Sequence, residues 1–297
     1  MGGGAWKQDD FVSYSCSTRG ISKSSIDYTT GSYTVNSHQD IFKSRTINEA
    51  LNPYKVTREC CDSAEHPKTI PVILALDVTG SMGDAAKEVA TKLNIIMTDL
   101  YSKVKDVEFM IMGIGDFAYD DAPLQVSQFE SDIRIAEQMD KIWFEEGGGG
   151  NSYESYTAAW YFGTKHCKLD CWNRGRKGII ITLGDENLNP YIPYKKLAKA
   201  TGDSLQGDVE TKELYKEAAE KYDIFHIYVD HHGYQYADMN TWTDVLPKQH
   251  VMSCKIKDIP QAISDIVTSA VTEAESFIEQ PDKKENTQTN EGEGIAW

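Results

Sequence analysis

The sequence is poor in the features that mark membrane, secreted or nucleic-acid-binding proteins. It has no apolar run near the roughly 18 residues that a membrane-spanning helix needs. Met1 to Trp6 lack the basic and apolar stretches of a signal peptide. Basic residues are scarce, because 30 Lys and Arg stand against 46 Asp and Glu, a net charge of −16 that repels phosphate-rich partners. We therefore expect a cytoplasmic, acidic protein that binds neither membrane nor nucleic acid.

Cysteine is also sparse, at six in 297 residues. A chain of this length does not need disulfide staples, and adjacent Cys60 and Cys61 would make a strained pair, so we expect reduced thiols. His166, Cys167 and Cys171 lie close together in the sequence. No second Cys/His pair at ligand spacing accompanies them, which favours ordinary thiols near a helix end over a zinc site.

Composition divides the chain into three zones. Residues 1–66 are rich in Ser, Thr, Tyr and Gly and predict an irregular N-terminal extension. Residues 67–280 hold the patterns of a folded domain. Residues 281–297 have almost nothing to bury and predict a disordered polar and acidic tail. The tail ends in Trp297, which either folds back on the body or docks on a partner.

Within 67–280, apolar runs of strand length alternate with helical patterns. The run from Ile70 to Asp77 suits a central strand buried on both faces, and a helix with Val89 and Leu93 on one face is predicted over 84–102. The short run 124–129 predicts an antiparallel edge strand. Further strands are predicted at 107–114, 178–183, 223–229 and 250–254, and further helices at 132–143, 154–165, 209–222 and 259–278. The pattern indicates an α/β fold, doubly wound, with a mostly parallel central sheet, one antiparallel edge strand and helices on both faces.

Hydroxyl and carboxylate residues gather in three loops that such a fold brings together, because ligands bind at the carboxyl ends of the strands. The first loop holds Asp77, Thr79 and Ser81 at alternate positions. The second contains Asn151-Ser152, and the third contains Asp185. These are hard oxygen donors of low total charge, which Mg²⁺ and Mn²⁺ prefer. The sequence therefore predicts a divalent-cation site.

The segment Asp77-Val78-Thr79-Gly80-Ser81-Met82 resembles the Asp-x-Ser/Thr-x-Ser motif of the metal-ion-dependent adhesion site in von Willebrand factor A domains. The resemblance covers roughly residues 70 to 278 and implies the von Willebrand factor A fold. It also implies that a free coordination position on the cation accepts an oxygen ligand, typically a carboxylate of a partner protein. The residues implied to surround Mg²⁺ or Mn²⁺, directly or through water, are Asp77, Thr79, Ser81, Asp185 and either Asn151 or Ser152.

Two loops depart from the common family pattern. The second loop lacks Gly-Gly-x-Thr and resembles a Gly-rich, Asp-then-Glu variant of some intracellular members, with Asn151 at the Asp place. The third reads Gly-Asp-Glu in place of Thr-Asp-Gly, so that either Asp185, which we favour, or Glu186 faces the metal. Asp116 and Glu154 stay open as additional members of the site. A plain structural alternative for the first loop is a helix start capped by Ser81.

The resemblance implies a cation-dependent protein-binding module and not an enzyme, working as an adaptor to an AAA-type ATPase or within a macromolecular assembly. A haloacid-dehalogenase-type phosphatase is disfavoured because Thr79 stands where its second acid belongs. Two alternatives stay open. One is a metal-assisted phosphoesterase or hydrolase whose cation is held by Asp77, Asp185 and Glu186. The other is an RNA-associated protein with this fold, against which the acidic charge weighs.

Overall fold

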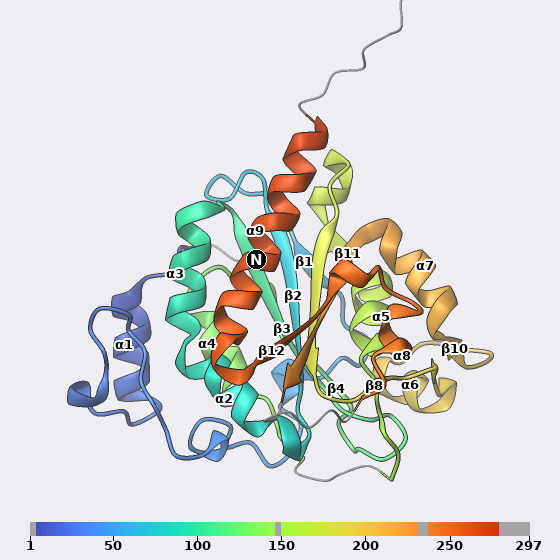
Figure 1. Ribbon diagram of the computed structural model, residues 1–297, viewed down its shortest axis with the longest axis horizontal. Helices are drawn as coiled ribbons and strands as arrows, with labels where there is room; N and C mark the ends of the chain where they lie inside the picture. The colour runs from blue at the N-terminus through green and yellow to red at the C-terminus, as the bar shows by residue number, and fades with distance from the viewer. Residues whose placement is uncertain (1–3, 146–149, 231–236, 279–297) are drawn as a thin grey trace, which may run out of the picture.

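A six-stranded sheet forms the centre of the computed structural model (Figure 1). The structure describes residues 4–145, 150–230 and 237–278, and for residues 275–278 it describes the backbone alone. The strand order is β12-β11-β7-β2-β3-β4. Neighbouring strands are parallel except β3 and β4, which are antiparallel. The expected doubly wound sheet with one antiparallel edge is thereby confirmed. The strands are β2 Ile70–Asp77, β3 Val107–Ile114, β4 Leu124–Val126, β7 Gly178–Gly184, β11 Tyr222–Asp230 and β12 Val251–Lys255.

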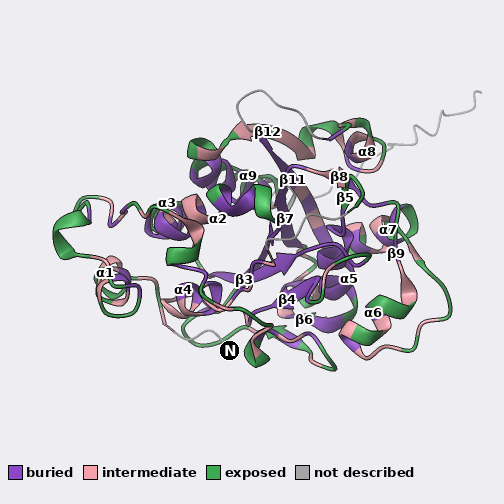
Figure 2. Ribbon diagram, turned by 90° about the horizontal axis from the view of Figure 1, so that it is seen from below, coloured by how far each residue is buried: buried purple, intermediate pink, exposed green. Residues whose placement is uncertain are grey.

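Helices cover both faces of the sheet (Figure 1). One face packs against α2 Gly83–Thr91, α3 Leu93–Lys103, α4 Arg134–Met139 and α9 Ile259–Ile278. The other packs against α5 Thr157–His166, α6 Tyr194–Thr201, α7 Thr211–Lys221 and α8 Asn240–Thr243. Strands β2, β3, β4 and β7 are buried between these layers at every position except Ile70, whereas the edge strand β12 is partly exposed (Figure 2). Among the described residues, no helix has the length and apolar character needed to cross a membrane.

Strand β2 shows why the central apolar run has no polar alternation. Successive side chains of a strand point to opposite faces of the sheet. Val72 and Leu74 belong to the core under α2, α3 and α9, whereas Ile73 and Ala75 belong to the core under α5 and α7. All four are essentially inaccessible to solvent. A strand covered by helices on both sides therefore needs apolar residues at every position.

Some element boundaries differ from the expected ones. The helix expected over 84–102 is two helices, interrupted at Lys92, whose φ of −107° and ψ of 10° leave the helical region. Two residues later, the amide of buried Asn94 accepts from Trp6 Nε1 and donates to the carbonyl of Thr30, each at 2.7 Å. The interruption thus lies beside the anchor of the N-terminal extension. The edge strand expected over 124–129 pairs only as β4, and α4 is shorter than the helix expected over 132–143.

The N-terminal extension is more ordered than its composition predicts. It contains α1, Gln8–Ser17, and its Phe11, Tyr33 and Phe42 belong to the same core as α3 and α9. A few buried aromatic rings bury a large area, and that is why a segment with so few apolar residues packs firmly. Short strand pairs complete the fold: β1 Arg58–Cys60 with β6 Cys167–Leu169, β5 Tyr153–Glu154 with β8 Asn187–Leu188, and β9 Tyr191–Ile192 with β10 Val209–Glu210. The expected tail, including Trp297, lies outside the described residues.

Candidate metal site

The acids of the first and third loops meet where two neighbouring parallel strands end. In the register of β2 and β7, Leu76 lies opposite Leu183, so Asp77 and Asp185 follow at the same edge of the sheet. Both carboxylates are at 0% exposure. Burial, followed by the charge of Asp185, raises the pKa of Asp77 well above its usual range. The structure therefore brings together two of the residues that the sequence singled out.

The first loop folds back on Asp77. Oδ1 of this residue accepts from the backbone N–H of Thr79 at 2.9 Å and from its hydroxyl at 2.6 Å. Ser81 is exposed in the 3₁₀ turn Gly80–Met82 that follows. The alternative in which Ser81 caps a helix is wrong, because the N-cap of α2 is Met82 and makes no side-chain capping bond. Ser81 is thus exposed, four residues after the buried carboxylate of Asp77.

Tyr156, which was not among the residues predicted from the sequence, provides a further hydrogen bond to Asp77. Its hydroxyl donates to Asp77 Oδ2 at 2.8 Å and accepts from the backbone N–H of Glu186 at 3.2 Å. The ring is at 0% exposure and packs against Trp242 and His226. A buried tyrosine hydroxyl needs a partner, but no local pattern in the sequence says which one.

The second loop contains the candidate ligands Asn151 and Ser152. Asn151 and Ser152 are both exposed. The Asn151 amide donates to Asp116 Oδ2 at 2.8 Å, and the Ser152 carbonyl accepts from Asn187 Nδ2 at 2.7 Å. Neither residue has a described hydrogen bond to Asp77, so a ligand role for either stays a prediction.

Glu154 is the buried acid of the second loop, at 5% exposure, and its Oε2 has no hydrogen-bond partner. Burial first, and then the charge of Asp77 among other acids, raises the pKa of Glu154 strongly. Burial and the charge of Asp185 also raise the pKa of Glu186. Burial and neighbouring acids are the largest causes that raise the pKa values of Asp77, Glu154 and Glu186. The candidate site therefore brings several carboxylates close together.

The donor set fits a hard divalent cation. Crowded carboxylates are costly until an opposite charge joins them, and a bound cation becomes the largest local charge in such a site. In residues 4–145, 150–230 and 237–278, no three His, Cys, Asp or Glu side chains are arranged to hold a metal ion by themselves. Coordination here would therefore also need the hydroxyls of Thr79 and Ser81 and water, the mixed oxygen set that Mg²⁺ usually has.

The His and Cys residues that lie close together in the sequence around position 167 form ordinary contacts in the structure. His166 Nε2 pairs with Asp203 at 2.7 Å, and burial raises the thiol pKa of both Cys167 and Cys171 to about 12, as for ordinary buried thiols. All six cysteines are free.

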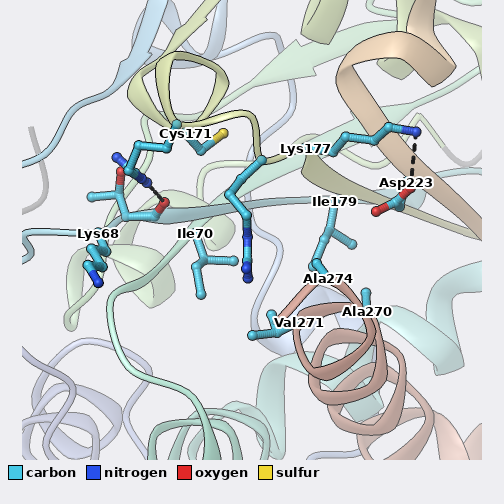
Figure 3. A pocket seen from close by; sticks show the side chains of 12 residues that line it. Lys68, Ile70, Cys171, Lys177, Ile179, Asp223, Ala270, Val271 and Ala274 are labelled. Carbon is cyan, nitrogen blue, oxygen red and sulfur yellow. Dashed lines mark hydrogen bonds and ion pairs between the residues drawn. The ribbon is translucent and has the colours of Figure 1, made fainter. Parts of the chain in front are cut away.

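A cavity of about 530 Å³ lies at the other end of the sheet, where β2, β7 and β11 begin (Figure 3). Two of its basic side chains have partners within the protein. Lys177 lies 3.5 Å from Asp223, and Arg174 donates to the carbonyl of Thr69 at 2.7 Å. The cavity is remote from the carboxyl ends of the strands and from the acids that gather there.

No family model matches this sequence, and no curated protein matches it. Several solved structures are similar. The pilus adhesin SpaC from Lactobacillus rhamnosus GG, in an open conformation, is 13% identical with a TM-score of 0.45, and the match covers 70% of this chain but only 30% of SpaC. The vWF domain of the type V pili tip protein Mfa5 from Porphyromonas gingivalis is 12% identical with a TM-score of 0.45, over 72% of this chain and 97% of that one. The SpRpn10 VWA domain is 15% identical with a TM-score of 0.39, over 67% and 94%.

The topology of this chain identifies its fold directly. Counted along the main sheet, the strands lie in the order third, second, first, fourth, fifth, sixth, and ligands of such sheets bind at the switch point between the first and the fourth. Here those strands are β2 and β7, which end at Asp77 and just before Asp185. The motif Asp77-to-Ser81 follows the first strand, and the third strand is the antiparallel edge. The chain therefore has a von Willebrand factor A-like fold.

Proposed function

We propose that this chain is a divalent-cation-dependent protein-binding module. Asp77, Thr79, Ser81 and Asp185 hold Mg²⁺ or Mn²⁺, directly or through water. When bound, the cation supplies a coordination position that accepts a carboxylate oxygen of a partner protein. The observation that supports this most is the pair of fully buried acids, Asp77 and Asp185, at the switch point of the sheet, where burial and the charge of Asp185 raise the pKa of Asp77.

The arrangement favours binding over catalysis. Thr79 directs both of its donors to Asp77 Oδ1, and Tyr156 directs its hydroxyl to Oδ2, so the carboxylate is held in place and is not free to attack a substrate. We include in the proposal a cytoplasmic location, which we expect from the sequence, and the role that the resemblance implies, work as an adaptor to an AAA-type ATPase or within a larger assembly.

Cation binding is tested by thermal unfolding with and without Mg²⁺ or Mn²⁺. At a hundredfold excess over Kd, the cation should raise the Tm of the wild type by about 5 °C, because a ligand that binds only the folded state stabilises it. Asp77→Ala should show no such shift. Asp10→Ala, an exposed acid of α1, is the matched control and should behave as the wild type. Equal shifts in the wild type and Asp77→Ala would rule out the metal assignment.

Partner binding is tested with the same proteins immobilised in a lysate of the source organism. The wild type should retain a partner in Mg²⁺ and release it in EDTA, whereas Asp77→Ala should retain none. Hydrolysis of p-nitrophenyl phosphate by the wild type, lost in Asp77→Ala, would instead contradict the proposal and favour the metal-assisted phosphoesterase.

A further inference from the structure

One buried hydroxyl joins all three loops of the candidate site. Tyr156 stands between the second loop and α5, donates to Asp77 of the first loop at 2.8 Å, and accepts from the Glu186 N–H of the third loop at 3.2 Å. Its backbone N–H also donates to the carbonyl of Glu154 at 2.9 Å. The relative positions of the three loops therefore depend on where this hydroxyl lies.

The hydrogen bonds to Asp77 leave a defined place for a cation. A carboxylate has about four lone-pair positions in its plane. Thr79 occupies two of them on Oδ1, and Tyr156 occupies one on Oδ2. Among the described donors to Asp77, none occupies the second position of Oδ2. Because Oδ1 and Oδ2 are both engaged, the carboxylate plane is fixed and that position points in one direction.

Gly184 is the sequence feature that makes room for Tyr156. A Cβ at residue 184 would lie 2.0 Å from the Tyr156 hydroxyl oxygen and 2.4 Å from Cζ, closer than real Cβ contacts allow. Any larger residue there would push the ring away from Asp77. The third loop's departure from the family pattern, Gly in place of Thr before Asp185, is thus explained by a steric requirement of the tyrosine.

The aromatic neighbours hold the ring of Tyr156 in this place. His226 stacks on Trp242 with ring centroids 3.4 Å apart, and the Tyr156 ring lies 5.3 Å and 5.1 Å from them. Trp242 Nε1 in turn donates to the carbonyl of Glu186 at 3.1 Å. Every one of these rings is fully buried. The hydroxyl is therefore held by packing and does not have to be ordered when a cation binds.

We propose that Tyr156 is a positioning residue of the cation site, which orients Asp77 and ties the second loop to the first and third. This inference rests on the proposed cation binding. Groups that orient metal ligands typically contribute 10- to 100-fold to metal affinity. Tyr156→Phe, which keeps the ring and removes the hydroxyl, should therefore weaken Mg²⁺ and Mn²⁺ binding by about 10- to 100-fold.

The experiment is calorimetric titration of each protein with MgCl₂ and MnCl₂. Tyr161→Phe is the matched control, since Tyr161 is a buried tyrosine of α5, the helix that follows Tyr156, and its hydroxyl donates to Asp203 at 2.6 Å. Its Kd should equal that of the wild type. Gly184→Ala is a second variant, expected to displace the Tyr156 ring and weaken binding similarly. Gly207→Ala, where an added Cβ meets nothing within 4 Å, is its control.

Each outcome decides between the two ideas. If the wild type binds no cation, the proposed function fails and this inference fails with it. If the wild type binds and Tyr156→Phe binds equally well, the positioning role is overturned while the proposed function stands. A lower Tm of Tyr156→Phe in EDTA with an unchanged Kd would mean that the hydroxyl only stabilises the fold, which also overturns the inference. If Tyr156→Phe does not fold, the Kd of Gly184→Ala decides.

Discussion

Buried charges in this molecule are of two kinds. Arg19 is buried opposite Asp140, where Nη2 lies 2.5 Å from Oδ1, and it also donates to the carbonyl of Ala90. Burial opposes the charge of Arg19, but Asp140 more than offsets this and raises the pKa of the guanidinium. Asp77 and Asp185 instead bring two like charges together, and the charge of Asp185 raises the pKa of Asp77. The first arrangement joins opposite charges, whereas the second joins two acids.

Arg19→Met tests how much the buried ion pair between Arg19 and Asp140 stabilises the fold. The substitution removes the opposite charge from Asp140 and leaves it the hydrogen bond from the Tyr14 hydroxyl. Breaking a buried ion pair typically costs about 3–5 kcal/mol of unfolding free energy. Urea denaturation followed by fluorescence measures this loss. Lys216→Met serves as the control, because Lys216 and Glu213 are exposed and such pairs add little stability. If both variants unfold at the same urea concentration, the ion pair between Arg19 and Asp140 does not stabilise the fold.

Among the elements, α3 and α9 are joined by a carboxylate. Asp99 of α3 accepts from Lys103 Nζ at 2.7 Å and from the hydroxyl of Ser264 on α9. The hydrogen bond from Lys103, followed by that from Ser264, lowers the pKa of Asp99. Two helices on the same face of the sheet are thus connected by a group whose charge depends on pH.

Asp99→Asn should remove this dependence. A carboxyl whose folded pKa lies below its unfolded value of about 3.9 adds stability above that value and loses it as pH falls through the folded pKa. At pH 7 we expect the variant to be less stable by roughly 0.5–1 kcal/mol, a value reduced for solvent screening. The difference in unfolding free energy between the wild type and Asp99→Asn should become smaller as the pH falls from 5 to 2, which urea denaturation at each pH measures.

Asp9→Asn is the matched control for this experiment, because Asp9 is exposed on α1. Its difference from the wild type should stay flat over the same pH range. A gap between the wild type and Asp99→Asn that is unchanged or wider in acid would contradict the assignment.

In the molecule as a whole, the N-terminal extension and the sheet domain share one core. The Phe11 ring is fully buried, with centroids 5.5 Å from Trp6 and 6.0 Å from Tyr33. These rings lie in the core that also holds the α2, α3 and α9 contacts with the sheet. We therefore expect the described part of the extension to unfold together with the domain.

Phe11→Ala tests this expectation. Removing a buried phenylalanine ring typically costs about 3–5 kcal/mol, and the variant should still unfold in a single transition. Tyr28→Ala, at a side chain 63% exposed, should change stability by less than about 0.5 kcal/mol. Calorimetry distinguishes the outcomes. A separate early transition, or a small loss in Phe11→Ala, would show that the extension is an independent appendage.

Features that depend on near neighbours in the chain could be predicted from the sequence. The unbroken apolar run of β2 predicted a strand buried on both faces, and the Asp77-to-Ser81 motif behind it predicted the edge of the sheet where the acids gather. These predictions succeed because periodicity and short spacing reflect local geometry. The sequence did not predict the interruption at Lys92 or the short length of β4, because the apolar pattern continues through both segments.

Which residues far apart in the sequence come into contact depends on the tertiary fold. Tyr156 lies 79 positions from Asp77, and no spacing rule links them, yet the hydrogen bond between them orients the first carboxylate of the site. Glu154 is likewise buried near Asp77 while Asn151 and Ser152 remain exposed. These contacts depend on chain crossovers and side-chain packing. The residues involved are far apart in the sequence, and the composition and periodicity of one segment carry no information about a distant one.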